Sequence, residues 1–304
     1  MKISLKNKLL ILLLCIFSST QPQDSNGKYE HTLGITCIFS DCAKYMKEWI
    51  EFHRLVGVSK FYLYNNLSKD DYKSVLQPYV DQGIVELYEW SFTWSKPGEF
   101  EPIKHSAYRD ALTRAQSKVQ WLAVIDSDEF LVPVDKDTLT EFLSDYQEYG
   151  AVCLNWQMYG TSHVPTIPSD KLMVECLTMK APTNMDPENR HVKSIIQTKY
   201  VQIPSVNDHF CLFNDGKTQV TPSKVSFFGP FSPTIEVDKA RVNHYWTREE
   251  DYYYNHKLPF RLQWDANPKA LEQYNHYMIV FNSIEDRIMD RFIPALRTRM
   301  NMAS

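Results

Sequence analysis

Residues 121–130 read WLAVIDSDEF, an apolar run that leads directly into Asp126, Asp128 and Glu129. The apolar part, residues 121–125, is typical of a strand buried within a sheet. Three carboxylates within four residues repel one another, so their place at the end of a buried strand is costly unless a cation neutralises them. Oxygen ligands select Mg²⁺, Mn²⁺ or Ca²⁺, and residues i and i+2 of a strand share a face. The stretch therefore predicts a metal site at Asp126 and Asp128; the alternative is an ordinary acidic turn.

The residues on both sides of this stretch alternate between strand and helix patterns. Short runs rich in β-branched residues predict strands, and runs with apolar residues three and four apart predict helices. The predicted strands are 32–39, 60–64, 84–90, 121–125 and 151–158, and the predicted helices are 43–55, 70–80, 103–117 and 138–149, the last capped by Asp137 or Thr138.

This alternation predicts an α/β fold with a parallel-rich, doubly wound sheet. Such sheets bind ligands at the carboxyl ends of their strands. Residues 160–240 contain many prolines and predict loops and short strands, whereas residues 241–302 are mostly helical in pattern. No long polar linker interrupts the sequence, so we expect residues 31–304 to form a single domain.

Length and composition exclude several classes of protein. The chain has 304 residues, of which 43% are hydrophobic and 13% aromatic, so it is neither disordered nor collagen-like. There are 33 Lys and Arg residues against 37 Asp and Glu residues, for a net charge of −4, and no long basic run follows residue 20. Binding of nucleic acid through its phosphates is therefore not expected.

The first 20 residues are typical of a targeting segment. Three lysines precede the apolar run 9–17, which is too short to span a bilayer. We expect residues 1–20 to be a signal peptide, or a short membrane anchor if they are not cleaved, and residues 21–30 to be a flexible leader. The protein is then exported or enters the secretory pathway, with membrane association through the N-terminus as the variant. Five cysteines remain after residue 20, and their spacing does not define a pairing.

Seven segments of the chain, in order, resemble glycosyltransferase family 92, within the broader GT-A fold. They are CAKYMKEWIEFHRLVGVSKFYLYNNLSKDDY (42–72), VLQPYVDQGIVELYEW (75–90), AYRDAL (107–112), WLAVIDSDEFLVP (121–133), LNWQMYGTSH (154–163), HVKSII (191–196) and VNHYWTREEDYYYNHK (242–257). The resemblance implies a Rossmann-like, mixed and mostly parallel sheet flanked by helices, with helices at the C-terminus. It also implies metal-dependent transfer of a hexose, with galactose favoured, from a nucleoside diphosphate sugar such as a UDP-hexose. The acceptor would be a glycan or another hydroxyl compound, and the transfer would proceed with inversion.

By the same resemblance, Asp126 and Asp128 would hold Mn²⁺ or Mg²⁺ against the donor diphosphate, where the ion stabilises the departing group. His244 is expected to be a further metal ligand or diphosphate contact; the alternative is a packed histidine. The loops after the first two strands are placed for the base and ribose, and basic side chains suit the phosphates. The candidate donor-binding residues are Asp41, Asn65, Asn66, Lys193, Arg248 and Lys257.

An inverting transfer needs a general base within hydrogen-bond reach of the acceptor hydroxyl. Asp208, Glu175 and His163 are the candidates, and Asp208 is favoured. Aromatic side chains between residues 156 and 210 offer faces for an acceptor sugar; they are Trp156, Tyr159 and His209. A second hypothesis is a GT-A-fold protein that has lost catalysis and binds a sugar or a partner. A third is a metal-dependent phosphoester hydrolase, but no second set of His and Asp residues is spaced for a two-metal site.

Overall fold

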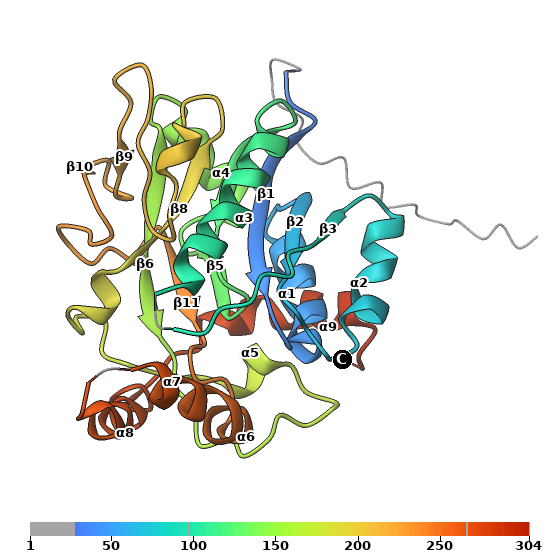
Figure 1. The fold of residues 1–304 in the computed structure, drawn as a ribbon, viewed down its shortest axis with the longest axis vertical. Coiled ribbons are helices and arrows are strands. Elements are labelled where there is room, and N and C mark those ends of the chain that lie inside the picture. Colours follow the sequence, from blue (N-terminus) through green and yellow to red (C-terminus); the bar gives the residue numbers. More distant parts are fainter. Residues whose placement is uncertain (1–27, 97, 266, 304) are drawn as a thin grey trace, which may run out of the picture.

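A computed structural model describes residues 28–96, 98–265 and 267–303 of the chain (Figure 1). The predicted signal peptide and most of the predicted leader lie outside these residues. Tyr29, which falls in the predicted leader, is buried. None of the helices in the described ranges is long and apolar enough to cross a membrane.

In the described ranges, ten strands make the main sheet, and two short strands pair apart from it. The ten are β1 (His31–Phe39), β2 (Lys60–Asn65), β3 (Val85–Glu89), β4 (Val119–Val124), β5 (Glu129–Pro133), β6 (Ala151–Met158), β8 (Val192–Gln197), β9 (Gln219–Val220), β10 (Ser226–Phe227) and β11 (Ala240–His244), and the separate pair is β7 (Met179–Lys180) with β12 (Ile284–Glu285). The order is β10-β9-β6-β8-β4-β1-β2-β3, and β11 pairs with both β6 and β5. Strands β4, β1, β2 and β3 are parallel, whereas β8 is antiparallel to both of its neighbours.

Helices cover both faces of the parallel part of the sheet (Figure 1). The helices are α1 (Ala43–Leu55), α2 (Tyr72–Asp81), α3 (Phe100–Ala115), α4 (Leu139–Leu143), α5 (Met173–Cys176), α6 (Glu250–Tyr252), α7 (Leu258–Trp264), α8 (Ala270–Val280) and α9 (Ile293–Met300), with a π-helical turn at Tyr253–Lys257 and 3₁₀ turns at Ser144–Tyr146, Glu188–Arg190, Ile203–Ser205 and Ile288–Arg291. This architecture confirms the prediction of a mixed, mostly parallel sheet flanked by helices, with further helices toward the C-terminus.

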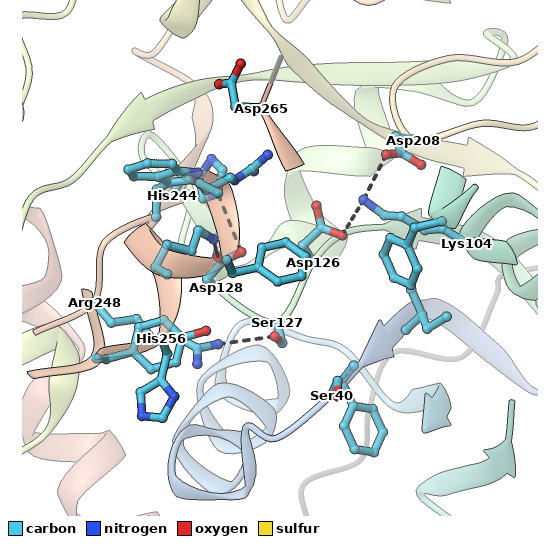
Figure 2. A pocket seen from close by; sticks show the side chains of 18 of the residues that line it. Ser40, Lys104, Asp126, Ser127, Asp128, Asp208, His244, Arg248, His256 and Asp265 are labelled. Carbon is cyan, nitrogen blue, oxygen red and sulfur yellow. Dashed lines mark hydrogen bonds and ion pairs between the residues drawn. The ribbon is translucent and has the colours of Figure 1, made fainter. Parts of the chain in front are cut away.

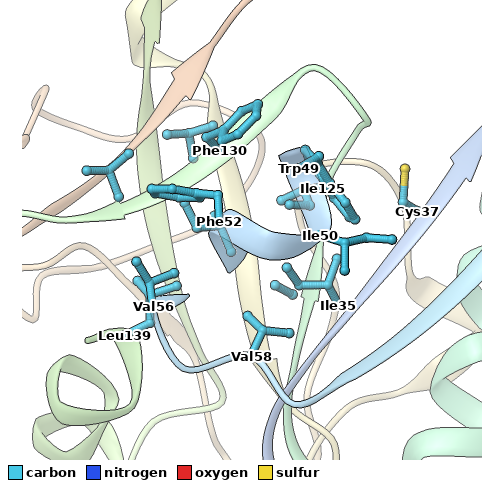
Figure 3. Packing of buried hydrophobic residues seen from close by; sticks show 14 of the residues in the cluster. Ile35, Cys37, Trp49, Ile50, Phe52, Val56, Val58, Ile125, Phe130 and Leu139 are labelled. Carbon is cyan, nitrogen blue, oxygen red and sulfur yellow. The ribbon is translucent and has the colours of Figure 1, made fainter. Parts of the chain in front are cut away.

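Strand alternation decides which helix packs on which face. Leu33, Ile35 and Cys37 of β1 pack into one cluster with α1, α2 and α9, as Figure 3 shows in part, whereas Ile38 packs into another with α3. Successive side chains of a strand point to opposite faces, so one buried strand serves both layers. All five cysteines in the described ranges are free thiols.

Several strands were not among those predicted, and two of them position the site. Glu129–Pro133 (β5) follows the acidic stretch at once and pairs antiparallel with Ala240–His244 (β11). Most of β11 lies in the region 241–302 that was predicted to be mostly helical. Each is five residues long and is stabilised mainly by its partner strand, so local propensity is a weak signal for it. The helix predicted over 138–149 ends as α4 at Leu143, and its predicted cap is confirmed: the Thr138 side chain accepts from the Glu141 N–H.

Helix α1 holds β5 through two direct hydrogen bonds to its backbone. The Trp49 indole N–H donates to the Glu129 carbonyl at 2.8 Å. The His53 Nε2 accepts from the Leu131 N–H at 3.1 Å, so its Nδ1 carries the proton and donates to the Trp49 carbonyl at 2.8 Å. Because β5 begins directly after the acidic stretch, these bonds also fix the position of that stretch.

The buried His53 predicts a loss of stability in acid. Burial lowers its pKa to about 3, although the hydrogen bond to Trp49 opposes this effect. The unfolded chain therefore binds a proton below about pH 6.5 that the folded chain excludes, and stability falls by up to about 1.4 kcal/mol per pH unit. His53→Gln, whose amide oxygen can still accept from Leu131, should remove about 2 kcal/mol of this loss between pH 6.5 and 5. Urea unfolding across this range measures it, with the exposed His276→Gln as control; an unchanged slope in His53→Gln would contradict the prediction.

Candidate functional site

A cavity of about 1220 Å³ lies at the carboxyl ends of β1, β2 and β4 (Figure 2). The residues that follow these strands line it: Ser40 and Asp41 after β1, Asn66 and Leu67 after β2, and Asp126 after β4. The segment from β11 to α8 supplies the facing wall. This edge is where open α/β sheets bind ligands.

The acidic residues occupy a turn between two strands. Strand β4 ends at Val124 and β5 begins at Glu129, so the expectation that Asp126 and Asp128 share the face of one strand is wrong. Both nevertheless line the cavity. His244 reaches the same place because it is the last residue of β11, where it pairs with Glu129 in the β5–β11 ladder.

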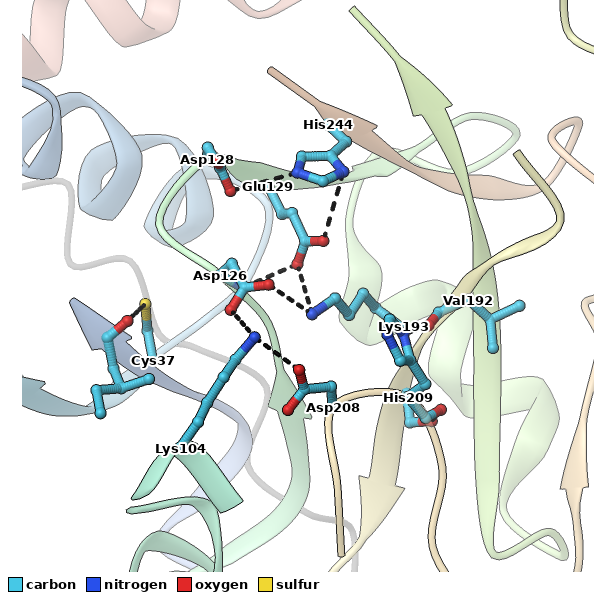
Figure 4. Close-up of polar contacts among 12 residues, drawn as sticks. Cys37, Lys104, Asp126, Asp128, Glu129, Val192, Lys193, Asp208, His209 and His244 are labelled. Atoms are coloured by element: carbon cyan, nitrogen blue, oxygen red, sulfur yellow. Dashed lines mark hydrogen bonds and ion pairs between the residues drawn. The ribbon is translucent and has the colours of Figure 1, made fainter. Parts of the chain in front are cut away.

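Two lysines neutralise Asp126 (Figure 4). Lys104 Nζ lies 2.9 Å from its Oδ1, and Lys193 Nζ lies 2.8 Å from its Oδ2. Lys193 also lies 3.3 Å from Oε2 of the buried Glu129, which accepts the Asp126 N–H. Burial would raise the pKa of Asp126, but the two lysines lower it below its ordinary value. Two lysines thus supply the cations that neutralise this part of the acidic stretch.

Asp128 faces different partners. Its Oδ2 lies 3.1 Å from Lys257 Nζ, and its Oδ1 lies 3.5 Å from His244 Nε2. Burial opposes ionisation of Asp128, but Lys257 and His244 hold its pKa well below the ordinary value. Carboxylate oxygens suit Mn²⁺ or Mg²⁺, and an imidazole nitrogen beside them suits a transition metal, so the pair favours Mn²⁺ over Mg²⁺.

The side chains that could bind a metal ion here suit an ion that is also bound by a phosphate group. Within the described parts of the chain, no group of three or more His, Cys, Asp or Glu side chains is arranged to hold a metal by itself. Mg²⁺ in phosphate sites commonly takes only one or two protein ligands, and phosphate oxygens and water supply the rest. Asp128 and His244 meet that requirement, whereas both oxygens of Asp126 already accept from lysines.

Arg248 is an anion-binding candidate held in an unusual backbone conformation. Its φ of 53° lies in the left-handed region, which is sparsely populated by such residues and frequent at functional sites. The guanidinium lies 4.0 Å from the ring centroid of Tyr45 and 4.5 Å from that of Tyr252, and Nη2 donates to Ser127 Oγ at 3.2 Å. Its Nε and Nη1 are buried with no hydrogen-bond partner in the described ranges. A guanidinium with free donors beside a cavity is suited to phosphate.

The other donor-binding candidates divide into two groups. Asp41, Asn66 and Lys257 line the cavity with Arg248. Asn65 does not line it, because its amide nitrogen donates to Tyr72 and Glu89 behind the loop. Lys193 does not line the cavity either. Only 1% of its side chain is exposed, and its ammonium group pairs with Asp126.

The three candidate bases lie in different places. Asp208 lines the cavity, with Lys104 Nζ 2.8 Å from Oδ2 and His105 Nε2 3.1 Å from Oδ1. Burial opposes ionisation of Asp208, but these neighbours lower its pKa below the ordinary value. Glu175 pairs with Arg297 at 2.7 Å and His163 is exposed, and neither lines the cavity. Neither residue is therefore placed to act as a base on an acceptor bound in this cavity.

Of the three aromatic residues proposed to contact the acceptor sugar, two line the cavity and one does not. Trp156 and His209 line the cavity, and their ring centroids lie 5.5 Å apart. Burial lowers the pKa of His209 to about 3, so it is neutral at physiological pH. Tyr159 is buried away from the cavity, where its hydroxyl accepts from Arg241 at 2.9 Å.

Sequence reasoning missed Lys104, which contacts both Asp126 and Asp208. A signal was present: Lys104 stands four residues before Tyr108, so the two share one face of α3. The Tyr108 hydroxyl also reaches Asp126, at 3.2 Å. The cavity wall formed by α7 and α8 was missed as well, because nothing local shows which face of a helix meets a cavity.

Comparison with known proteins points to one family. The sequence profile described as glycosyltransferase family 92 matches residues 35–285. A family 92 protein of Arabidopsis thaliana is 23% identical over 267 residues, which are 82% of this chain and 42% of that protein. A protein named β-1,4-galactosyltransferase galt-1, from Caenorhabditis elegans, is 29% identical over 121 residues, 38% of this chain and 28% of that protein. The chain spans 23–42% of the length of the curated plant relatives it matches.

Solved structures resemble the chain more loosely. The crystal structure of HddC from Yersinia pseudotuberculosis shares 15% sequence identity with it, with a TM-score of 0.37. The match covers 76% of this chain and 99% of that protein.

Proposed function

The chain belongs to glycosyltransferase family 92, and from this premise we propose that its cavity binds a nucleoside diphosphate sugar and transfers the sugar to a hydroxyl acceptor. The observation that supports this most strongly is the arrangement around the turn between β4 and β5. There Asp128 and His244 lie side by side, with the cations Lys257 and Arg248 next to them. This combination suits a diphosphate and its metal ion.

We propose that the transfer depends on Mn²⁺ or Mg²⁺, held by Asp128 and His244. When bound, the ion offsets the charge that develops on the departing diphosphate. Arg248 and Lys257 would contact the phosphate oxygens, and Asp41 and Asn66, at the ends of β1 and β2, would face the nucleoside.

Asp208 is the proposed general base for a transfer with inversion. Its lowered pKa keeps it ionised at neutral pH, ready to accept the proton of the acceptor hydroxyl. The same contacts with Lys104 and His105 make it a weak base, because proton-transfer efficiency falls when the pKa lies far below the working pH. Its contribution to the rate should therefore be modest beside that of Asp128.

We propose that the sugar donor is a UDP-hexose, and that UDP-galactose is the favoured one. The support is the family and the name of the Caenorhabditis elegans relative, which matches 38% of this chain. The predicted signal peptide over residues 1–20 adds the proposal that the protein enters a secretory compartment, either released or tethered at its N-terminus.

A thermal-shift screen tests the proposed function. The full chain is melted with UDP, GDP, UDP-galactose and UDP-glucose, each with and without Mn²⁺. A ligand present at 100 times its Kd stabilises the native state by about 2.7 kcal/mol, so we expect Tm to rise by about 5 °C with one nucleotide and only with the metal. If no pair raises Tm, the protein would instead be a family member that binds a sugar or a partner without catalysis.

A further inference from the structure

The two ends of the cavity differ in chemistry. Near the turn between β4 and β5 the lining combines the cations Lys104, Arg248 and Lys257 with the carboxylates Asp126, Asp128 and Asp208, most of them in ion pairs. The end formed by α7, α8 and the 3₁₀ turn Glu188–Arg190 carries two carboxylates, two tyrosines and Arg261. Figure 2 shows Ser40 and Asp265 on opposite sides of the turn, so the nucleoside end and this second end are well separated.

We call the second end the tyrosine wall, which consists of Glu188, Trp246, Asp265, Tyr274, Tyr277 and Phe281. Its polar groups are linked in pairs. The Tyr277 hydroxyl donates to Glu188 Oε1 at 2.7 Å, and the Tyr274 hydroxyl donates to Asp265 Oδ2 at 2.6 Å. These bonds set the direction of each carboxylate while leaving it lone pairs to accept further hydrogens.

The apolar part of the wall consists of stacked rings that are largely buried, with Trp246 7% and Phe281 1% exposed. Tyr277 and Phe281 lie parallel, with centroids 5.0 Å apart, and Trp246 packs edge-on against Phe281 at 6.1 Å. Like Lys257, Arg261 is a cation of the lining that lies near this wall, 5.7 Å from the ring centroid of Trp246. It also acts on Asp265, whose pKa it helps to lower after the hydrogen bond from Tyr274.

The wall lies next to the proposed diphosphate site. Lys257 Nζ is 5.2 Å from the ring centroid of Trp246 and 3.1 Å from Asp128 Oδ2, so one side chain separates the two regions. The cavity volume, about 1220 Å³, exceeds the 300–1,000 Å³ typical of a site for one small molecule. It has room for a second reactant beside the donor.

We propose that the tyrosine wall is the acceptor subsite and that it selects a neutral, hydroxyl-rich group, such as an uncharged sugar residue. Carboxylates accept hydrogen bonds from hydroxyl groups, and the partly exposed ring of Tyr277 can cover an apolar C–H face of a sugar. Glu188 and Asp265 would repel a sulfated, phosphorylated or carboxylated group placed against them. This inference rests on the proposed function for its role in transfer, but binding at the wall can be measured without transfer.

The test is a titration of tryptophan fluorescence, which Trp246 should report. The probes are neutral oligosaccharides ending in galactose, glucose or N-acetylglucosamine and their sulfated counterparts, with and without UDP and Mn²⁺. We expect saturable binding of a neutral probe and at least tenfold weaker binding of its sulfated form. Glu188→Gln keeps an acceptor for the Tyr277 hydroxyl but removes the charge, and it should weaken neutral binding about tenfold or more.

Tyr277→Phe should weaken it similarly, whereas Tyr254→Phe, an exposed tyrosine outside the cavity, should not. Binding of UDP with Mn²⁺ should be unchanged in all three variants, which a collapse of α8 would not allow. Equal binding of sulfated and neutral probes, no binding of any neutral probe, or wild-type affinity in both wall variants would overturn the subsite. Failure of wild type to bind any nucleotide would overturn the proposed function instead, and neutral-probe binding would still stand as glycan binding.

Discussion

Asp128→Asn is expected to abolish metal-dependent binding of UDP and to lower transfer at least about a hundredfold. Loss of a residue that only supports a metal ligand already costs 10- to 100-fold, and Asp128 would be a ligand itself. The amide keeps the size of the side chain but removes the charge that Lys257 and His244 face at 3.1 and 3.5 Å. Asp128 is 8% exposed, so loss of its charge should also lower stability, by at most about the 3–5 kcal/mol that breaking a buried ion pair costs.

Electron paramagnetic resonance of Mn²⁺ with UDP measures the binding, and release of UDP from the donor sugar measures the reaction. Asp145→Asn, the same change at an exposed position outside the cavity, is the control. Full transfer by Asp128→Asn would exclude this residue as a metal ligand. Lost transfer with normal Mn²⁺ and UDP binding would place Asp128 on the acceptor side of the reaction instead.

Lys193→Met is expected to lower the free energy of unfolding by about 3–5 kcal/mol, the usual cost of removing one partner from a buried ion pair. Lys193 is 1% exposed and serves two carboxylates, Asp126 at 2.8 Å and Glu129 at 3.3 Å. Without it, the fully buried Glu129 must either stay charged beside Asp126 or take up a proton. Either outcome raises the free energy of the folded state.

A double-mutant cycle in urea separates the ion pair from general packing. Glu129→Gln removes the charge that Lys193→Met leaves unpaired, so the double variant should recover part of the loss. Lys136→Met, at an exposed position, controls for the loss of a lysine. If Lys193→Met alone were as stable as wild type, the network beneath the acidic turn would contribute nothing to the fold.

The predicted sheet follows from local patterns. Strands β1, β2, β4 and β6 and helix α1 lie within a few residues of their predicted bounds, because runs of apolar residues and helical periodicity act over short distances. The position of Asp126 directly after strand β4 was likewise predicted from the apolar run that precedes it. The resemblance to family 92 added His244, Arg248 and Lys257, whose positions in the sequence show no link to that strand.

Their convergence depends on contacts between distant parts of the chain. The β5–β11 ladder brings His244 opposite Glu129, and neither strand has a strong pattern of its own. Lys104 and Lys193 come from α3 and β8 to neutralise an acidic turn that, taken alone, suggested a metal ion. Glu175 and His163 share the residue types of a general base but lie outside the cavity. Residue type and periodicity are local properties, whereas register, charge pairing and access to a cavity depend on which distant segments pack together.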